Sequence, residues 1–525
     1  MSLSQPAPPV RPRTRPAKAL AELIALFGDE RTIAGGDPAA VVISGITLNS
    51  ATVEPGDVFV ALTGLKQHGA RFAADAAAAG AVAILTDGAG VELSAATGLP
   101  VVVRDELRAS LGAIAAWLFD TASAPMKFFG ATGTDGKTSM AHILEAVLSQ
   151  LGVRTGLSST AERHVDGQKL KSGLTTPETV DLHSLIARWA EGGVEAAVIE
   201  VSAQAIERHR VDGVVFDVAG FTNLTHEHLD DYGDMATYFE AKRPFLTSAH
   251  ARAGVASLDT EWGRKIADGA DIPVQTIGSD PALAPDWLVE VTAEEIDGVS
   301  FTLTRTADGW SIDSRVSVLG RHMASNAALA IAMLSLGGYG DDELADAVRG
   351  GIDVYIPGRA ERVSGDRGPT VWVDYGHTED AMARNLDAVR AVMKPGGRLI
   401  CLFGAAGNRD TLKRPFMAAA VVDHSDLAII TDHHPNMEDP AAIRATLHEA
   451  AQKRADDTKP GFPLLEIALP EDAIRHAISI AAEDDAILYF GPGHEHHRNI
   501  QGVRVPFGGV DEVRAALREA GWPTR

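Results

Sequence analysis

A glycine-rich turn between a short apolar strand pattern and a helix pattern constrains this chain more than any other feature. The apolar pair Phe128–Phe129 leads into the turn. Gly136-Lys137-Thr138 then opens a segment whose apolar residues recur at helical spacing as far as Leu151. Gly152 follows, where a helix commonly ends. Strand, glycine-rich turn, Lys-Thr and helix is the order that a phosphate-binding loop requires.

Each part of this loop has a role in holding phosphates. Glycines let backbone N–H groups approach phosphate oxygens, and the helix N-terminus adds partial positive charge. The Lys137 ammonium can reach the outer phosphates, and the Thr138 hydroxyl can bind Mg²⁺. The general pattern has glycine where this chain has Ala131, so the alternative is a glycine-rich turn with a chance Lys-Thr pair.

Size and charge narrow the class of protein. The chain of 525 residues is long enough for about three domains. Its net charge of −24 argues against sequence-independent binding to nucleic acid or to an anionic membrane. A single cysteine, Cys401, excludes a disulfide framework and a cysteine-based zinc site, so a cytoplasmic location is expected. No apolar run reaches the ~18 residues of a membrane span.

Alternating strand and helix patterns predict an α/β protein of three domains. A Pro- and Arg-rich disordered tail is expected at 1–18, followed by domains at 19–123, 124–355 and 356–525. In the third domain, a Rossmann-like parallel sheet, four apolar runs each end in a polar loop. Because the carboxyl ends of parallel strands meet at one edge of a sheet, a ligand site is expected there. The four runs are 370–373, 399–403, 427–431 and 486–490.

The central domain offers further candidates for metal binding. Glu200 lies near the end of the buried strand pattern 196–201, where it can bind a metal, position a water or cap a neighbouring helix. Residues 225–231, THEHLDD, follow the strand pattern 216–224 and can bind a metal or form a solvated loop. Their place directly after a buried strand favours the metal site. Lys242, on a helix pattern at 235–246, has the setting of an ordinary surface lysine.

Taken together, these motifs resemble the Mur ligases of peptidoglycan synthesis, most closely the MurE type, over roughly residues 40–515. The family usually has Asn at the position of Asp135 and Arg at the position of Ala51. The matching segments are GATGTDGKTS (130–139), EVSAQA (200–205), FTNLTHEHLD (221–230), GRAE (358–361), VDYGHT (373–378) and GNRD (407–410).

The resemblance implies an ATP- and Mg²⁺-dependent ligase with three domains: an N-terminal uridine-binding domain, a central ATPase domain and a C-terminal Rossmann-like domain. The family phosphorylates the terminal carboxylate of UDP-MurNAc-L-Ala-D-Glu, and the amine of a free amino acid then displaces the phosphate. Such an enzyme serves cell-wall synthesis, cell shape and cell division. It is expected to be a monomer that binds neither nucleic acid nor membrane.

The resemblance also implies roles for particular residues. The catalytic set is Lys137, Glu200, His228 and Lys242. Carbamylated Lys242, with Thr138, Glu200 and His228, would hold the metal. The nucleotide-binding set is Gly133, Thr134, Asp135, Gly136, Lys137, Thr138, Ser139, Asn326, Arg359 and Asp374. The substrate-binding set is Ser50, His68, Thr175, Thr176, Ser202, Arg208, Arg210, Arg409, Asn436, Gly491 and Glu495.

The choice of amino acid is where the chain departs from its family. Diaminopimelate-adding enzymes carry Asp-Asn-Pro-Arg where this chain has His433-His434-Pro435-Asn436. The distal carboxylate of diaminopimelate would therefore lose a bidentate partner. Arg409 and Glu495 match positions for an α-carboxylate and a distal amine, which favours L-lysine or L-ornithine.

Three alternatives to these assignments stay open. The same reaction with meso-diaminopimelate is possible if another arginine enters the site. A zinc site among the histidines of the third domain is conceivable, although these loops match ligand-binding loops. The alternative of another class is an inactive nucleotide-binding regulator, against which the intact Lys137, Thr138 and Lys242 argue.

Overall fold

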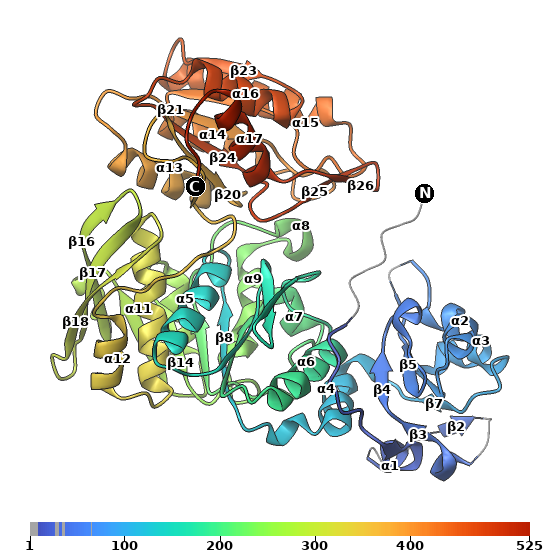
Figure 1. Ribbon diagram of the computed structural model, residues 1–525. Helices are drawn as coiled ribbons and strands as arrows, with labels where there is room; N and C mark the ends of the chain where they lie inside the picture. Colours follow the sequence, from blue (N-terminus) through green and yellow to red (C-terminus); the bar gives the residue numbers. More distant parts are fainter. Residues whose placement is uncertain (1–8, 27–30, 34–36, 65) are drawn as a thin grey trace. The chain divides into compact units, whose positions relative to one another are not determined.

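The computed structural model describes residues 9–26, 31–33, 37–64 and 66–525 (Figure 1). The chain forms two compact units that are interleaved in sequence. The first comprises 1–130, 153–219 and 244–252, and the second comprises 131–152, 220–243 and 253–525. Strands β8 (Lys127–Thr132) and β13 (Val218–Phe221) begin in the first unit and end in the second.

The first unit begins with a five-stranded sheet in the order β2-β7-β6-β5-β4. Its strands β4 to β7 are parallel, and β2 pairs antiparallel with β7. The strands are β2 (Arg31–Ile33), β4 (Gly45–Thr47), β5 (Asp57–Ala61), β6 (Ala83–Thr86) and β7 (Val101–Val103). The helices are α1 (Leu20–Ala25), α2 (Ala73–Ala78), α3 (Val91–Ala95) and α4 (Leu107–Phe119).

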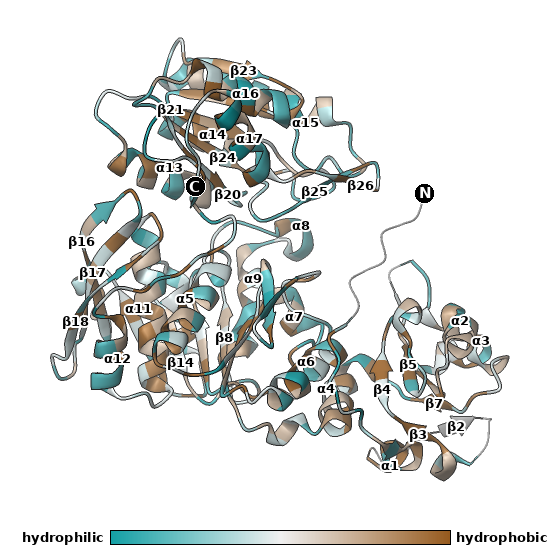
Figure 2. Ribbon diagram, viewed as in Figure 1, coloured by the Kyte–Doolittle hydropathy of each residue, from teal (hydrophilic) through white to brown (hydrophobic). Residues whose placement is uncertain are grey.

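Alternating side chains of β5 supply both cores of this sheet. Val58 and Val60 pack with residues of α1 and α4, whereas Phe59 and Ala61 pack with residues of α2. Successive side chains of a strand point to opposite faces, so helices cover both faces of the sheet. Figure 2 shows the hydrophobic character of β4, which is coloured brown.

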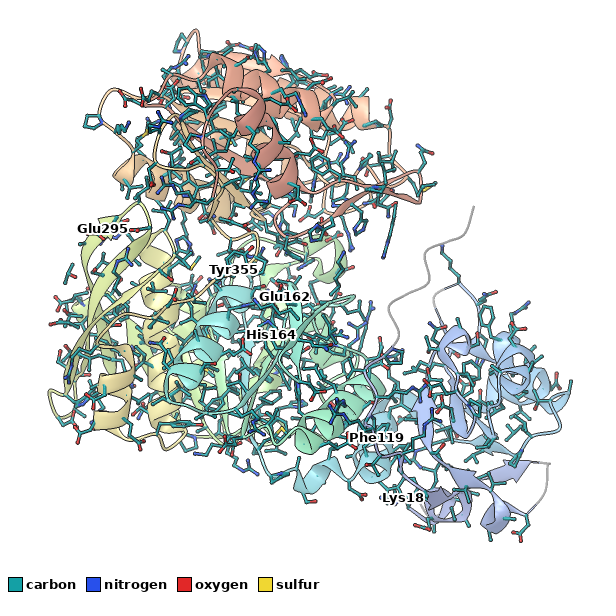
Figure 3. The ribbon with its side chains drawn as sticks, in the orientation of Figure 1. Lys18, Phe119, Glu162, His164, Glu295 and Tyr355 are labelled. Carbon is teal, nitrogen blue, oxygen red and sulfur yellow. The ribbon has the colours of Figure 1, made fainter. Side chains whose placement is uncertain are left out.

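The rest of the first unit carries a second group of strands, in the order β11-β10-β9-β12. β9 and β12 are parallel, and β10 is antiparallel to both β9 and β11. On β10, Glu162 Oε2 lies 3.1 Å from His164 Nε2, and Figure 3 labels both residues. The elements are β9 (Thr155–Ser158), β10 (Glu162–Val165), β11 (Gln168–Lys171), α6 (Thr179–Glu191), β12 (Ala196–Glu200) and α7 (Ala203–Glu207).

Residues 9–18 are held against the first unit, which corrects the prediction of a disordered tail for that part; residues 1–8 lie outside the described residues. The Arg11 guanidinium donates to both carboxylate oxygens of buried Asp57, at 2.8 and 2.7 Å. β1 (Lys18–Ala19) pairs with β3 (Val42–Ile43), and Lys18 Nζ lies 2.6 Å from Asp120 Oδ1, just beyond α4 (Figure 3).

The second unit contains consecutive strands β14 to β18, parallel as far as β16 and antiparallel from there. The buried helix α11 contacts α5 and several of these strands. The elements are α5 (Lys137–Gln150), α8 (Leu229–Tyr232), α9 (Met235–Lys242), β14 (Gly254–Ser257), α10 (Glu261–Asp268), β15 (Val274–Gly278), β16 (Trp287–Glu295), β17 (Gly298–Arg305), β18 (Ser311–Val316), α11 (Arg321–Leu336) and α12 (Asp341–Val348).

The second unit also contains a six-stranded sheet in the order β19-β20-β24-β21-β22-β23, parallel except for β19. Cys401 is buried in β21. The strands are β19 (Glu361–Arg362), β20 (Thr370–Asp374), β21 (Leu399–Phe403), β22 (Leu427–Ile430), β23 (Leu464–Glu466) and β24 (Ala486–Phe490), with a hairpin of β25 (His497–Ile500) and β26 (Val503–Pro506). The helices are α13 (Glu379–Val392), α14 (Arg414–His424), α15 (Pro440–Thr458), α16 (Pro470–Ile480) and α17 (Gly509–Glu519).

None of the helices in the described part of the chain combines the length and the apolar character needed to cross a bilayer.

Candidate active site

The phosphate-binding loop lies between β8 and α5, and its glycines are sterically required. Gly133 has φ +148°, and a Cβ there would lie 1.9 Å from Thr222 Oγ1. Gly136, at φ +83°, would place a Cβ 2.9 Å from Asn326 Oδ1. Lys137 Nζ donates to the carbonyl oxygens of Gly133 and Thr134 at 3.1 and 2.7 Å. The ammonium therefore lies over the loop, where it can meet phosphate oxygens.

Asp135 is held on several sides within the second unit. Its backbone N–H donates to Asn223 Oδ1 at 2.9 Å. Its carboxylate accepts from the hydroxyls of Thr225 and Thr378 at 3.0 and 3.4 Å. Burial and the nearby negative charge of Glu227 raise the pKa of this carboxyl. The residue thus fixes the loop's shape through neutral donors.

Lys242 is buried rather than on the surface, which corrects the setting expected from its helix pattern. Its side chain is among the largest fully buried ones, and Nζ donates to the Gly133 carbonyl at 2.8 Å. Nζ also lies 4.4 Å from the centre of the Tyr238 ring. Burial and the positive charge of Lys137 hold the pKa of Lys242 well below its usual value. A neutral amine at this position is a nucleophile for CO₂, as carbamylation requires.

His228 lies beside the same tyrosine. Its ring meets Tyr238 edge to face, with centroids 6.0 Å apart, and its φ of +57° turns the chain just before α8. Burial lowers the pKa of His228, which leaves a lone pair available to a metal. His228, Asp230 and Asp231 place ligand atoms within 4.8 Å of one another.

Glu227, which the sequence analysis did not single out, is the most heavily paired acid of this region. His377 Nε2 lies 2.7 Å from its Oε1, and Lys413 Nζ lies 3.6 Å from the same atom. Burial alone would raise the pKa of Glu227, but the charge and hydrogen bond of His377, with His228 and Lys413, hold it well below the usual value. Glu227 and His377 come from segments far apart in sequence, so no local sequence pattern could predict their contact.

Arg359 and Asp374 bring a later part of the chain to the phosphate-binding loop. Arg359 Nη2 donates to Thr138 Oγ1 at 3.2 Å, and its guanidinium lies 4.4 Å from the Tyr375 ring centre. Asp374 is buried and accepts backbone N–H groups from Ala360 and Gly376 at 2.7 and 2.6 Å. Burial raises the pKa of Asp374. The second unit therefore brings together the loop, His228, Lys242, Asn326, Arg359 and Asp374.

The loops predicted to select the amino acid meet one another at Asn499. Asn436 has φ +52°; its Nδ2 donates to the Gly407 carbonyl at 2.6 Å, and its backbone N–H donates to the Asn499 carbonyl at 3.0 Å. Asn499 in turn donates its N–H to His434 Nδ1, and His434 Nε2 contacts the Glu495 carboxylate. Asn436 and Glu495 thus belong to one hydrogen-bonded cluster.

Two further residues of that predicted set lie on the loops that follow β24 and β21. The Gly491 N–H donates to the Asp374 carbonyl at 2.9 Å, and its φ of +114° with the His433 ring beside it leaves little room for a side chain. Arg409 is exposed on the loop after β21.

Four of the predicted residues lie together in the first unit. The buried Glu200 carboxylate accepts the backbone N–H and the hydroxyl of Thr160 at 2.7 and 3.0 Å. Thr160 Oγ1 donates to Thr175 Oγ1, and Thr176 Oγ1 donates to the Glu200 carbonyl, at 2.9 and 2.8 Å. Ser202 caps α7 through Ala205 N–H at 3.2 Å. Glu200 belongs to the first unit, whereas Thr138, His228 and Lys242 belong to the second.

The remaining predicted residues of the first unit have their own partners. Arg210 Nη2 lies 2.9 Å from Glu178 Oε1, and the Arg208 carbonyl accepts from Arg108 at 3.5 Å. Ser50 opens a short 3₁₀ turn capped by Asn49. His68 accepts the Ala70 N–H at Nδ1 and lies 2.9 Å from Asp87 Oδ1 through Nε2.

Three family models match the chain in sequence order. The model described as "Mur ligase family, catalytic domain" matches residues 42–116, and "Mur ligase middle domain" matches residues 131–334. The model described as "Mur ligase, glutamate ligase domain" matches residues 358–493. Together they cover most of the chain.

Relatives match over the full length of the chain. The chain is 49% identical over 524 residues to the "UDP-N-acetylmuramyl-tripeptide synthetase" of Leifsonia xyli subsp. xyli, covering 99% of this chain and 100% of that protein. It is 38% identical over 522 residues to the "UDP-N-acetylmuramoyl-L-alanyl-D-glutamate--2,6-diaminopimelate ligase" of Streptomyces coelicolor, covering 99% of each.

Solved structures share the fold. A structure of "UDP-N-acetylmuramoyl-L-alanyl-D-glutamate--2, 6-diaminopimelate ligase" superposes with a TM-score of 0.64 at 24% identity, over 96% of this chain and 99% of that one. MurF from Acinetobacter baumannii gives 0.64 at 16% identity, over 86% and 91%. The three-domain α/β fold expected from the sequence is confirmed.

Proposed function

The chain belongs to the Mur ligase family, and on that premise we propose that it joins a diamino acid to the terminal carboxylate of UDP-MurNAc-L-Ala-D-Glu. It is an ATP-dependent acid–amino-acid ligase of the MurE type, as the sequence motifs predicted. The observation that carries the proposed substrate is the full-length match at 49% identity to a protein named as a tripeptide synthetase.

Lys137 and the backbone N–H groups of its loop would hold the phosphates of ATP, because the ammonium already lies over that loop. Asn326, Arg359 and Asp374 would complete the nucleotide site. Within the second unit, the donor set of Thr138, His228 and carbamylated Lys242 suits Mg²⁺, since most of its atoms are oxygens. When bound, the ion would reduce the repulsion between the γ-phosphate and the attacking carboxylate.

The reaction proceeds in two displacements. A carboxylate oxygen of the D-Glu residue forms a bond to the γ-phosphorus as ADP leaves, which gives an acyl phosphate. The neutral amine of the incoming amino acid then attacks the acyl carbon, phosphate leaves with the bridging oxygen, and the new amide loses one proton. Positioning and charge stabilisation supply most of the rate, so no strong general base is required.

We assign the UDP-MurNAc-dipeptide to residues of the first unit: Ser50, His68, Thr175, Thr176, Ser202, Arg208 and Arg210. Thr175, Thr176 and Ser202 share one hydrogen-bonded cluster with Glu200, which supports a common role. We further propose that the enzyme acts in the cytoplasm as a monomer.

For the amino acid we favour L-lysine or L-ornithine, held by Arg409 and Glu495 beside Asn436. Asn436 has no charge with which to bind a second carboxylate, and its amide is engaged with Gly407. meso-Diaminopimelate is the second candidate, because relatives 36–38% identical are named as diaminopimelate ligases.

Oxygen transfer tests this chemistry. UDP-MurNAc-L-Ala-D-Glu with ¹⁸O in its terminal carboxylate should pass one ¹⁸O atom to inorganic phosphate for each amide formed. The Lys137→Ala variant should fold, as judged by its melting temperature, and release no phosphate. Amide formation with unlabelled phosphate would contradict the acyl phosphate. No phosphate release by the unaltered protein would favour the inactive regulator.

A further inference from the structure

His434 and Glu495 form a contact between two loops at the edge of the six-stranded sheet that the proposed substrate assignments do not yet use. His434 follows β22 and Glu495 follows β24, 61 residues later. Nε2 of His434 is within hydrogen-bond distance of Glu495 Oε2. On its other side, Nδ1 of the same ring lies 2.9 Å from the backbone nitrogen of Asn499, whose N–H points to it. Both ring nitrogens of His434 therefore already have a hydrogen-bond partner.

These two contacts fix the tautomer of His434. A backbone N–H can only donate, so Nδ1 must present its lone pair. In a neutral imidazole the single proton then resides on Nε2, where it is donated to Glu495. A second proton on Nδ1 would face the Asn499 N–H, donor against donor. The backbone of β25 thus leaves Nε2 as the nitrogen through which His434 donates to Glu495.

The same hydrogen bonds of His434 argue against a metal bound between His434 and Glu495. His433, His434 and Glu495 offer ligand atoms within 4.8 Å of one another, which is the spacing of a candidate metal cluster. A metal bound to Nε2 would need the lone pair there and the proton on Nδ1. Nδ1 already accepts the Asn499 N–H, so the cluster is built for a hydrogen bond to a carboxylate.

One oxygen of Glu495 remains available to a ligand. The His434 ring contacts Oε2, and no hydrogen bond from the described residues reaches Oε1. The side chain is partly exposed, at 25%. Burial would raise the pKa of Glu495, but the hydrogen bond from His434 and the histidines around it lower it below the usual value. A fixed, ionised carboxylate with one free oxygen is a receptor for an ammonium group.

We propose that His434 is a positioning residue that aims Glu495 at the distal ammonium of the incoming diamino acid, and so selects diamino acids over amino acids with apolar side chains. This inference rests on the proposed function of the site. It does not depend on which diamino acid is used, because lysine, ornithine and diaminopimelate all carry a distal ammonium.

The test compares L-lysine with L-norleucine, which has the same carbon chain without the distal amine. The measured quantity is the ratio of kcat/KM for the two, or of their inhibition constants where norleucine is not a substrate. If diaminopimelate or ornithine proves to be the substrate, it replaces lysine. His434→Leu should lower this ratio about 10- to 100-fold, mainly through the KM of the diamino acid, because a hydrogen bond to a charged group is lost.

Two further variants separate positioning from folding. His434→Gln offers an acceptor to Asn499 and a donor to Glu495, so it should recover most of the ratio. The matched control is His424→Leu, since His424 is a surface histidine paired with Asp387 through Nδ1 at 2.6 Å. It should leave the ratio unchanged. Equal losses for both amino acids in His434→Leu, or no loss, would overturn the proposal.

Nitrogen NMR of histidine-labelled protein gives a readout that needs no turnover. His434 should show a protonated Nε2 and an unprotonated Nδ1, and adding lysine, but not norleucine, should shift its Nε2 signal. The opposite tautomer, or stoichiometric Zn²⁺ binding that His434→Leu abolishes, would refute the proposal. If no amino acid is turned over but this NMR response is present, the proposed ligase function fails while the role of His434 stands.

Discussion

The Arg359 guanidinium lies 3.2 Å from the Thr138 hydroxyl oxygen, although 221 residues separate the two in sequence. The contact brings a cation from the turn before β19 to the first residues of α5, where the phosphate-binding loop ends. The centre of the Tyr375 ring lies 4.4 Å from the guanidinium carbon. We therefore propose that Arg359 contacts the phosphates of ATP.

The Arg359→Ala variant is expected to raise the KM for ATP about 10-fold, because a charge-assisted contact to phosphate is lost. Arg359→Lys should recover little, since a lysine lacks the forked guanidinium that can bind phosphate through two N–H groups. Steady-state kinetics with ATP varied would measure both. The matched control is Arg367→Ala, at an exposed arginine of the same region. An unchanged KM for ATP in Arg359→Ala would show that Arg359 does not contribute to nucleotide binding.

Lys242→Met is expected to abolish turnover, with a loss of at least about 100-fold, without lowering the melting temperature. The amine is fully buried, so replacing it by an apolar side chain of similar length removes the cost of burying a polar group. If the amine adds CO₂ and loses a proton to become a carbamate, stripping CO₂ from the wild-type protein should reduce its activity and bicarbonate should restore it.

The control for Lys242 is Lys265→Met, at a surface lysine that lies over Trp262. Its activity should not change. Wild-type activity in Lys242→Met would show that neither the amine nor its carbamate takes part in the reaction.

Much of the fold follows from sequence patterns that are local. The predicted segments 399–403 and 486–490 coincide with β21 and β24, because each is an apolar run with clear ends. The sequence patterns did not predict β16 (Trp287–Glu295). Only residues near Trp287 are buried in this strand, so its second half lacks the regular apolar alternation that marks a strand. The helix expected at 235–246 ends as an α-helix at Lys242 and continues as a 3₁₀ turn.

The candidate site was predictable in its parts but not in its contacts. Motif order predicted roles for Lys137, Asn326 and Arg359, and these residues lie around the same loop. The burial of Lys242 was hidden, because the apolar residues of α9 are spread around the helix and mark no single inward face. Glu227 and its partner His377, 150 positions apart, meet only through tertiary packing. The order found at residues 9–18 likewise depends on Asp57, a carboxylate far along the chain.

Glu227→Gln is expected to lower the free energy of unfolding by about 2 kcal/mol at pH 6, the size of a hydrogen bond to a charged group. The pKa of Glu227 is lower in the folded than in the unfolded protein, where a Glu has a value of about 4.3. Its contribution is therefore fully present above about pH 5 and is lost as the pH falls through the folded-state pKa.

Denaturant unfolding of wild type and Glu227→Gln at pH 6 and pH 3 would measure this. The difference between the two proteins should shrink at the lower pH. A difference that stays constant over this range would show that the ionised carboxylate does not stabilise the fold.

Asn436→Arg is expected to shift selectivity toward meso-diaminopimelate, raising its kcat/KM relative to lysine about 10-fold, because a guanidinium can bind the second carboxylate. The variant should lose about 1 kcal/mol of stability, since the bond to the Gly407 carbonyl is lost and φ is positive. Asn436→Ala is the control, with the same stability loss and no gain in diaminopimelate use. Equal selectivity in the Asn436→Arg and Asn436→Ala variants would show that this position does not influence the choice of amino acid.

The most direct test of the account is the mass of the product formed from ATP, Mg²⁺ and UDP-MurNAc-L-Ala-D-Glu. L-lysine, L-ornithine and meso-diaminopimelate are offered one at a time. The account predicts a UDP-MurNAc-tripeptide with lysine or ornithine, with one phosphate released per product. Product with diaminopimelate alone would contradict the proposal that Asn436 favours lysine or ornithine. No product with any amino acid would contradict the ligase function itself.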